Sequence, residues 1–223
     1  MALRKYDLFV FDLDGTLIDS AQDIANAANA ARGQFGLTPL PLETIKNFVG
    51  RGVVRLLKDV FESEDPQIIE QAMALFFKFY DENCLVHTRL YPFTIEMLEM
   101  MKPKPLVILT NKPKNFSDKI VSGLGLSKYF KWVLGGDSFS TKKPDPEGLL
   151  WITNELKISP KRTLFVGDSA VDFETGRRAE VTTALLAQGF CDRKSLEKLS
   201  PDWLFQDVKE MVQWLKTPDP TAV

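Results

Sequence analysis

The chain has 223 residues, of which 44% are hydrophobic and 26% charged, with 28 lysines and arginines against 30 aspartates and glutamates. This is the composition of a globular protein, and it excludes a disordered or fibrous chain. The length suffices for one large domain or two modest ones. The net charge of −2, without a basic cluster, argues against nucleic acid as a partner.

The sequence also argues against a membrane or a secreted location. No apolar run approaches the roughly 20 residues that are needed to cross a bilayer. Near the N-terminus an apolar run passes directly into Asp12 and Asp14, which is not the pattern of a secretion signal. Cys84 and Cys191 are far apart and form no Cys-x-x-Cys pattern, so we expect two free thiols. We therefore expect a cytoplasmic protein without a membrane partner.

The first predicted element is a strand over residues 8–11, and a long helical stretch follows it. In this stretch apolar residues recur at the spacing of one helix face and no strand signal interrupts them. The helical patterns cover residues 24–35, 42–60 and 68–80. An insert of this size is too large for a loop. We therefore expect a small helical cap domain over residues 19–88, inserted after the first strand.

Two helix starts are marked inside this insert. Ser20 with Asp23 three residues later predicts a capping box, in which the two side chains satisfy backbone N–H groups at the helix start. Asp65 before Pro66 predicts an N-cap residue followed by a first-turn proline.

Five further apolar runs of strand length follow the insert, separated by helical patterns. They cover residues 106–109, 132–134, 164–166, 183–187 and 203–205. Continuous apolar runs indicate strands buried on both faces, and their alternation with helices indicates a parallel sheet that is covered on both sides. We predict an α/β fold with a doubly wound parallel sheet, in a core domain of residues 1–18 and 89–223. Residues 217–223 have the composition of a flexible tail.

Acidic residues follow two of these strands. In open α/β sheets, ligands bind beyond the carboxyl ends of the strands. Asp12 and Asp14 are two residues apart at the end of an extended segment, so we expect both carboxylates to point at a single spot. Asp168, which follows a neighbouring strand, adds a third acid. Such an oxygen-rich cluster suits a hard cation, and we infer Mg²⁺.

Hydrogen-bond donors and a lysine follow two other strands. Thr110 and Asn111 can donate to phosphoryl oxygens, and Lys143 can neutralise their charge. Lys143 precedes Pro144, which favours an extended backbone there, whereas we expect Lys142 to be solvated. A divalent cation, a hydroxyl, an amide and a lysine together predict a site for a phosphoryl group.

The nucleophile at this site is predicted to be a carboxylate. The only histidine, His87, falls outside the four loops, so a serine nucleophile would lack its usual base. Our hypothesis is that Asp12 attacks phosphorus, while Asp14 protonates the leaving oxygen and later takes a proton from water.

The four motifs occur in an order that resembles the haloacid dehalogenase-like superfamily, and the resemblance covers nearly the whole chain. The motifs are Asp-Leu-Asp-Gly-Thr at 12–16, Leu-Thr-Asn at 109–111, Lys-Pro-Asp-Pro at 143–146 and Gly-Asp-Ser-x-x-Asp at 167–172. Residues 11–25, 35–39 and 49–52 are similar to phosphoglycolate phosphatases with a helical cap. Dehalogenase members of the family lack the second aspartate, so Asp14 favours phosphoryl transfer.

The resemblance implies roles for individual residues. It implies Mg²⁺ bound by Asp12, by the main-chain carbonyl of Asp14 and by Asp168. It also implies that Asp172 steadies Lys143 or a metal-bound water.

In the predicted cap, the resemblance implies that the loop with Arg51 and Gly52 faces the non-phosphate end of the substrate. Two positions depart from the family pattern, because Phe93 and Glu180 stand where glycine is usual. The first bears on the hinge and on substrate preference.

The resemblance therefore implies a Mg²⁺-dependent phosphatase, a monomer or homodimer, acting on a small phosphorylated metabolite, phosphoglycolate first. One alternative is a β-phosphoglucomutase-like phosphomutase, which would pass the phosphoryl group to a second sugar hydroxyl. Another is a pyrophosphatase or nucleotidase of the same fold. A catalytically silent binding protein is a further alternative, against which the intact set of Asp12, Asp14, Lys143 and Asp168 speaks.

Overall fold

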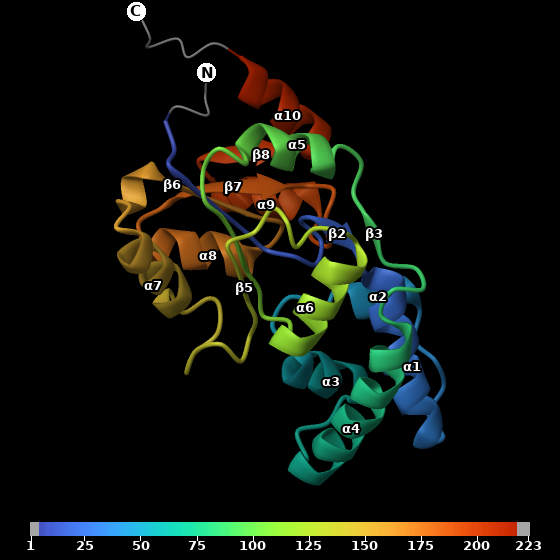
Figure 1. Ribbon diagram of the computed structural model, residues 1–223. Coiled ribbons are helices and arrows are strands. Elements are labelled where there is room, and N and C mark those ends of the chain that lie inside the picture. The colour runs from blue at the N-terminus through green and yellow to red at the C-terminus, as the bar shows by residue number, and fades with distance from the viewer. Residues whose placement is uncertain (1–4, 218–223) are drawn as a thin grey trace, which may run out of the picture.

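A computed structural model describes residues 5–217 of the chain (Figure 1). Its centre is a six-stranded sheet with the order β5-β4-β1-β6-β7-β8, and every neighbouring pair is parallel. The strands are β1 Leu8–Phe11, β4 Leu106–Leu109, β5 Trp132–Leu134, β6 Thr163–Gly167, β7 Thr182–Leu186 and β8 Trp203–Phe205. All six predicted strands are confirmed, and their bounds differ from the prediction by one residue at most.

Helices cover both faces of the sheet. They are α5 Thr94–Met101, α6 Lys114–Gly123, α7 Glu147–Leu156, α8 Ala170–Arg178, α9 Arg193–Leu199 and α10 Val208–Lys216. Side chains of β1 alternate between two apolar clusters: Phe9 and Phe11 belong to one, and Leu8 and Val10 to the other. A strand with both faces buried reads as a continuous apolar run. The prediction of a doubly wound parallel sheet is therefore confirmed.

The insert after β1 is helical, as predicted. It contains α1 Ala21–Gln34, α2 Leu42–Lys46, α3 Val53–Phe61 and α4 Pro66–Asn83. A two-stranded antiparallel ribbon, β2 Ile18–Asp19 with β3 Arg89–Leu90, carries the chain out of the core and back. In Figure 1 α4 reaches farthest from the sheet, and α1 lies alongside it. The ribbon lies at the predicted ends of the insert, residues 19 and 88. That the insert is a separate domain stays a prediction.

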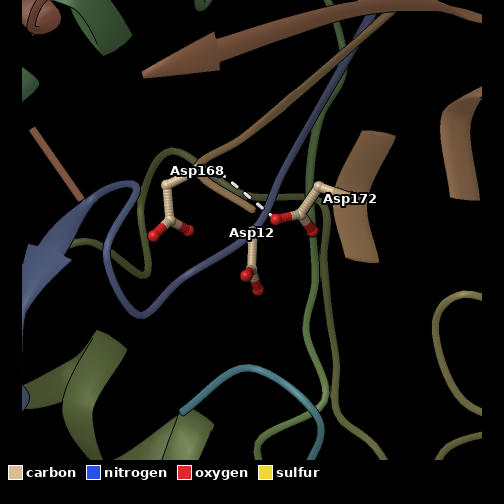
Figure 2. A group of neighbouring side chains, drawn as sticks. All are labelled: Asp12, Asp168 and Asp172. Carbon is tan, nitrogen blue, oxygen red and sulfur yellow. Dashed lines mark hydrogen bonds between the residues drawn. The ribbon is translucent and has the colours of Figure 1, made fainter. Parts of the chain in front are cut away.

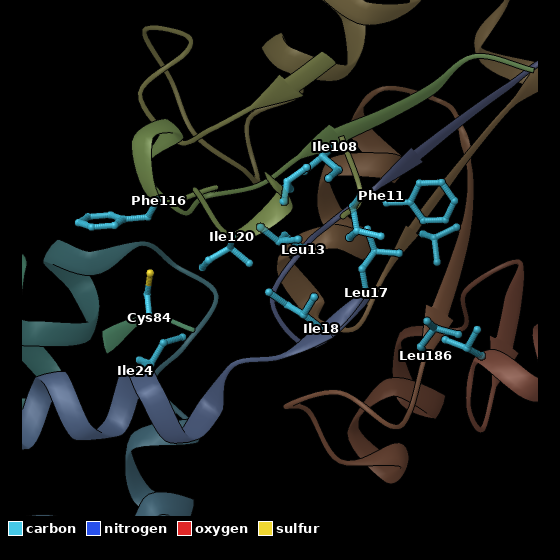
Figure 3. Packing of buried hydrophobic residues seen from close by; sticks show 14 of the residues in the cluster. Phe11, Leu13, Leu17, Ile18, Ile24, Cys84, Ile108, Phe116, Ile120 and Leu186 are labelled. Carbon is cyan, nitrogen blue, oxygen red and sulfur yellow. The ribbon is translucent and has the colours of Figure 1, made fainter. Parts of the chain in front are cut away.

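The insert and the sheet share one apolar cluster. Figure 3 shows Leu13 and Leu17, which follow β1, packed between Ile108 of β4 and side chains of the insert such as Ile24. All four are buried. This continuity fixes where the insert stands over the carboxyl end of the sheet.

The predicted capping box at the start of α1 is wrong. The Ser20 hydroxyl donates instead to a carboxylate oxygen of Asp14 at 2.5 Å. The Asp23 carboxylate accepts hydrogen bonds from the backbone N–H groups of His87 and Thr88 and from the Thr88 hydroxyl, at 2.8–3.0 Å. The reason is tertiary, because the chain returning toward β3 offers Asp23 three donors that a local pattern does not contain.

The second predicted helix start is confirmed, since Asp65 accepts a hydrogen bond from the N–H of Gln67 at 2.9 Å and Pro66 is the first residue of α4. Both cysteines are free thiols, also as predicted. Phe93 and Glu180 have φ angles of 67° and 56°. Glycine adopts this left-handed conformation more readily than other residues do. Phe93 and Glu180 therefore carry backbone strain that glycine would avoid.

Two remaining expectations concern the chain as a whole. In the part of the chain that the structure describes, no helix is both long and apolar enough to cross a membrane. The predicted flexible tail at 217–223 lies outside the described residues, apart from its first position.

Candidate active site

Three carboxylates meet where β1 and β6 end. Asp12 follows β1 directly, Asp168 follows β6, and Asp172 lies in the first turn of α8. Each offers an oxygen that lies within 4.8 Å of the other two, and all three side chains are buried (Figure 2). Adjacent parallel strands bring their carboxyl ends together, so the placement of Asp12 and Asp168 follows from the sheet order.

Two glycines make room for Asp168. A Cβ atom at Gly15, where φ is 82°, would lie 2.2 Å from Asp168 Oδ2, and one at Gly189 would lie 2.3 Å from Asp168 Cβ. Asp168 also accepts hydrogen bonds from the N–H of Phe190 at 2.8 Å and from the Thr16 hydroxyl at 3.2 Å. The backbone at Gly15 and at Gly189 therefore packs directly against the Asp168 carboxylate.

Lys143 joins the acid cluster through its ammonium group. Its Nζ lies 2.9 Å from Asp12 Oδ1 and 2.6 Å from Asp172 Oδ1, and the side chain is 3% exposed. The other oxygen of Asp172 accepts hydrogen bonds from Ser169 and from the backbone N–H of Asp168, so Asp172 is itself fixed. Lys143 and Asp172 thus lie in contact, where the resemblance places them, and Lys142 is exposed as predicted.

The electrostatics of the cluster follow from burial. Burial raises the pKa of Asp12 to about 6 although Lys143 opposes the shift. Burial, together with the neighbouring Asp172 and Asp12, raises the pKa of Asp168. Burial lowers the pKa of Lys143, but Asp12 and Asp172 outweigh it and bring the pKa to about 12. The lysine is therefore charged at neutral pH. Its single positive charge does not cancel the effect of burial on the pKa values of Asp12 and Asp168.

Asp14 does not join this three-acid cluster, although Asp12 and Asp14 both line the small cavity between insert and core. The expectation of two carboxylates at a single spot therefore holds for the cavity and not for the acid cluster. Asp14 lies outside the three-acid group, and both of its oxygens lie 3.0 Å from Lys112 Nζ. The alternation rule holds for an extended strand. Here the chain bends at Leu13 and turns at Gly15, so the rule no longer applies.

Lys112 and Tyr80 are site residues that the sequence analysis missed. Lys112 Nζ donates to the Tyr80 hydroxyl at 2.7 Å and lies 4.7 Å from the centre of the Tyr80 ring. Tyr80 belongs to α4 of the insert, so this contact joins the two parts of the chain. The position of Lys112 directly after Thr110 and Asn111, at the end of a buried strand, is the one sequence signal that could have singled it out.

Thr110 and Asn111 lie beside the acids. The Asn111 amide nitrogen donates to the carbonyl of Gly50 at 3.0 Å and to the carbonyl of Lys143 at 2.9 Å. Both amide protons are therefore used in this conformation, and one of them binds the insert to the core. Thr110 lies against Asp12, where its hydroxyl favours the ionised carboxylate.

Arg51 and Gly52 border two different cavities. Arg51 is exposed and lines an open cleft of about 700 Å³ that Asp14 and Asp168 also reach. Gly52 lines a small cavity of about 60 Å³ between insert and core. The walls of this small cavity are apolar side chains of α1, α3, α4 and α6, and its polar lining comes from Asp12, Asp14, Thr110, Asn111 and Lys112.

Comparison with known proteins agrees with this geometry. The model of the haloacid dehalogenase-like hydrolase family matches residues 9–186. A phosphoglycolate phosphatase of Psychrobacter arcticus is 37% identical over 218 residues, covering 93% of this chain and 95% of that protein. One from Aquifex aeolicus is 36% identical, covering 92% and 95%.

A solved structure agrees in shape as well. The protein from Haemophilus somnus 129pt, described as a "predicted phosphoglycolate phosphatase", superposes with a TM-score of 0.90. It is 27% identical, and the match covers 95% of this chain and 99% of that one. The chain belongs to the haloacid dehalogenase-like hydrolase family. Within that family it is an enzyme of the phosphatase type, a phosphoric monoester hydrolase.

The close fit of Gly15 against Asp168 predicts that Gly15→Ala displaces this carboxylate. We expect kcat on a phosphomonoester to fall about 10²-fold, the loss typical of moving a reacting group by roughly 1 Å. Gly125→Ala is the matched control, because Gly125 has a φ of 70° with no atom within 4 Å of its Cβ position. Steady-state kinetics and urea unfolding of both variants test this. Equal kinetic effects would contradict the assignment.

Proposed function

We propose that the protein is a Mg²⁺-dependent phosphatase that hydrolyses a small phosphomonoester, phosphoglycolate first, through an aspartyl-phosphate on Asp12. The observation that carries the proposal is the placement of Asp12, which is buried between Lys143 and the carboxylates of Asp168 and Asp172 and borders the small cavity between insert and core. Curated relatives that match more than nine-tenths of the chain are named phosphoglycolate phosphatases, which supports the choice of substrate.

Asp12 is suited to act as the nucleophile. One of its carboxylate oxygens, Oδ1, is buried and lies 2.9 Å from the Lys143 ammonium. This oxygen forms the new bond to phosphorus, and the ester bond to the leaving oxygen breaks. Asp14 gives that oxygen a proton, and later takes one from the water that hydrolyses the aspartyl-phosphate.

The donor set at the site fits a hard divalent cation. Three buried carboxylates within 4.8 Å of one another provide oxygen ligands and more negative charge than Lys143 balances. We propose that Asp12, Asp168 and the main-chain carbonyl of Asp14 hold Mg²⁺. When bound, the ion would offset the charge on the phosphoryl oxygens.

The surrounding residues position the phosphoryl group. Lys143, held by Asp172, would neutralise the equatorial oxygens, and Thr110 would donate a hydrogen bond to one of them. Asn111 would contribute its amide once it releases the carbonyl of Gly50 or of Lys143, to which it now donates.

The helical insert would act as a cap that excludes water and selects the leaving group. Its loop at Gly50 contacts Asn111, and Gly52 lines the small cavity between insert and core. Arg51 would act from the open cleft on the far end of a substrate. The free thiols Cys84 and Cys191 support a cytoplasmic location, and we propose a monomer or homodimer.

Replacing the nucleophile tests the mechanism. Asp12→Asn should lower kcat on a phosphomonoester by at least ~10³-fold, the loss expected for a missing nucleophile. An acid quench of wild type during turnover should trap a labelled, base-labile phosphoenzyme, which the variant lacks. Asp118→Asn is the control, since Asp118 is an exposed partner of Lys114 and should keep both activity and label. A variant of Asp12 that is still labelled would refute the mechanism.

A substrate panel tests the reaction class. Phosphoglycolate, sugar phosphates, nucleotides and pyrophosphate are compared by kcat/KM, with inorganic phosphate and the organic product both measured. We expect phosphoglycolate to lead, with phosphate released stoichiometrically. An isomerised sugar phosphate without free phosphate would indicate the phosphomutase instead. Preference for pyrophosphate or a nucleotide would replace the proposed substrate, and an absence of turnover would indicate a binding protein.

A further inference from the structure

A small cavity and an open cleft border the proposed phosphoryl site, and they offer different charges to the far end of a substrate. Asp12 lines the cavity between insert and core, Asp168 lines the cleft of about 700 Å³, and Asp14 lines both. A phosphoryl group at Asp12 therefore has two spaces beside it for the rest of the substrate. The cations in each lining decide which chemistry that space accepts.

The small cavity has no cation to spare. Among the described residues of its lining, Lys112 alone is positively charged. An ammonium group has three N–H donors. Lys112 Nζ lies 3.0 Å from each oxygen of Asp14 and 2.7 Å from the Tyr80 hydroxyl, so its donors are committed. A second anionic group of a substrate would here lie against apolar walls and a carboxylate, which is costly.

The open cleft has two cations without an acidic partner. Lys46, the last residue of α2, and Arg51 both line it. Neither side chain forms an ion pair within residues 5–217. Lys46 is half-buried, and Arg51 is exposed. An anion that enters the cleft therefore meets positive charge that no protein group has neutralised.

The carboxylates of the cleft are occupied or solvated. Three of them have partners of their own: Asp14 with Lys112, Asp59 with Arg55 and Asp192 with Ser195. Glu43 is exposed, so salt and water screen its charge. Asp168 belongs to the acid cluster, which would hold Mg²⁺. The two cations are therefore the groups that an incoming anion can pair with.

Lys46 is held near the acid cluster by a contact with the core. Its Nζ lies 5.9 Å from the centre of the Phe190 ring, within the range of a cation–π interaction. The backbone N–H of Phe190 donates to Asp168 at 2.8 Å. A single residue thus connects Lys46 to the acid cluster. The ring accepts no classical hydrogen bond, which leaves the three N–H donors of Lys46 for water or a ligand.

We propose that Lys46, together with Arg51, binds a second anionic group of the substrate and thereby selects phosphomonoesters of hydroxy acids over those of neutral alcohols. The inference rests on the proposed function, in which Asp12 takes the phosphoryl group. Phosphoglycolate belongs to this class, because its carboxylate is attached to the carbon that bears the ester oxygen. Lys46 would contact the substrate away from phosphorus, so its loss should alter the choice between substrates.

The experiment compares kcat/KM on phosphoglycolate with kcat/KM on its neutral carboxamide, phosphoglycolamide, which has nearly the same shape. Lys46→Met and Arg51→Met each remove one charge, and Lys46→Arg retains it. Lys78→Met is the matched control, since Lys78 is exposed on α4 and lines neither the cavity nor the cleft. Circular dichroism and urea unfolding report the folded fraction of each variant.

We expect the wild type to prefer the acid over the amide. Lys46→Met should lower this preference about 10-fold, as for the loss of one hydrogen bond between charged groups, and should slow the amide much less. Arg51→Met should lower it by a smaller factor, because an exposed charge is screened more strongly. Lys46→Arg should keep most of the preference, and Lys78→Met should keep all of it. Added salt should weaken the preference of the wild type.

A preference that is unchanged in Lys46→Met, or an equal loss on both substrates, would overturn the inference. Equal kcat/KM of the wild type on acid and amide would do so as well, while the phosphatase mechanism would stand. If the wild type hydrolyses neither substrate and forms no phosphoenzyme, the proposed function fails and the inference fails with it. Should Lys46→Met not fold, Arg51→Met and Lys46→Arg decide the outcome.

Discussion

Excess negative charge at the end of the sheet is the constraint on which this site depends. Four carboxylates, those of Asp12, Asp14, Asp168 and Asp172, stand against the two ammonium groups of the site's lysines. Five of these six side chains are at most 11% exposed. The sixth residue, Asp168, is 2% exposed as a whole. With all four carboxylates ionised, two negative charges are left without a partner among these groups. This is unfavourable away from water, and burial correspondingly raises the pKa values of Asp12 and Asp168. One divalent cation carries the charge that would restore the balance.

The fold brings these charged groups together at one end of the sheet. A central parallel sheet brings the ends of β1 and β6 together, and Gly15 and Gly189 let the backbone approach Asp168 closely. Asp172 is fixed at the start of α8 and holds Lys143. These contacts fix the acids before any ligand arrives, so the chemistry needs little reorganisation.

The two lysines divide the site into a part that is fixed and a part that depends on the cap. The pair of Lys143 and Asp12 is built from the core alone. The pair of Lys112 and Asp14 is completed by Tyr80, which arrives on α4.

The strands and the residues that directly follow them could be predicted from the sequence, because both are encoded by neighbouring residues. Continuous apolar runs specify strands buried on both faces, and the residues after them, such as Asp12 and Asp168, reach the site through the sheet order alone. The contacts that could not be predicted join residues distant in sequence. Asp23 binds the chain at Thr88 and Lys112 binds Tyr80, and no periodicity or spacing encodes either pairing. That Asp14 stands outside the acid cluster could not be predicted, because a single bend at Leu13 ends the strand alternation.

The most direct test of the charge balance is the thermal unfolding of chelator-treated protein with added Mg²⁺, at constant ionic strength. At Mg²⁺ near one hundred times its Kd, binding to the folded state should raise Tm by about 5–10 °C, as expected for roughly 2.7 kcal/mol in a chain of this size. Asp168→Asn, which removes one of the unbalanced charges, should lose most of that rise. An unchanged Tm in wild type, or an equal rise in the variant, would contradict the account.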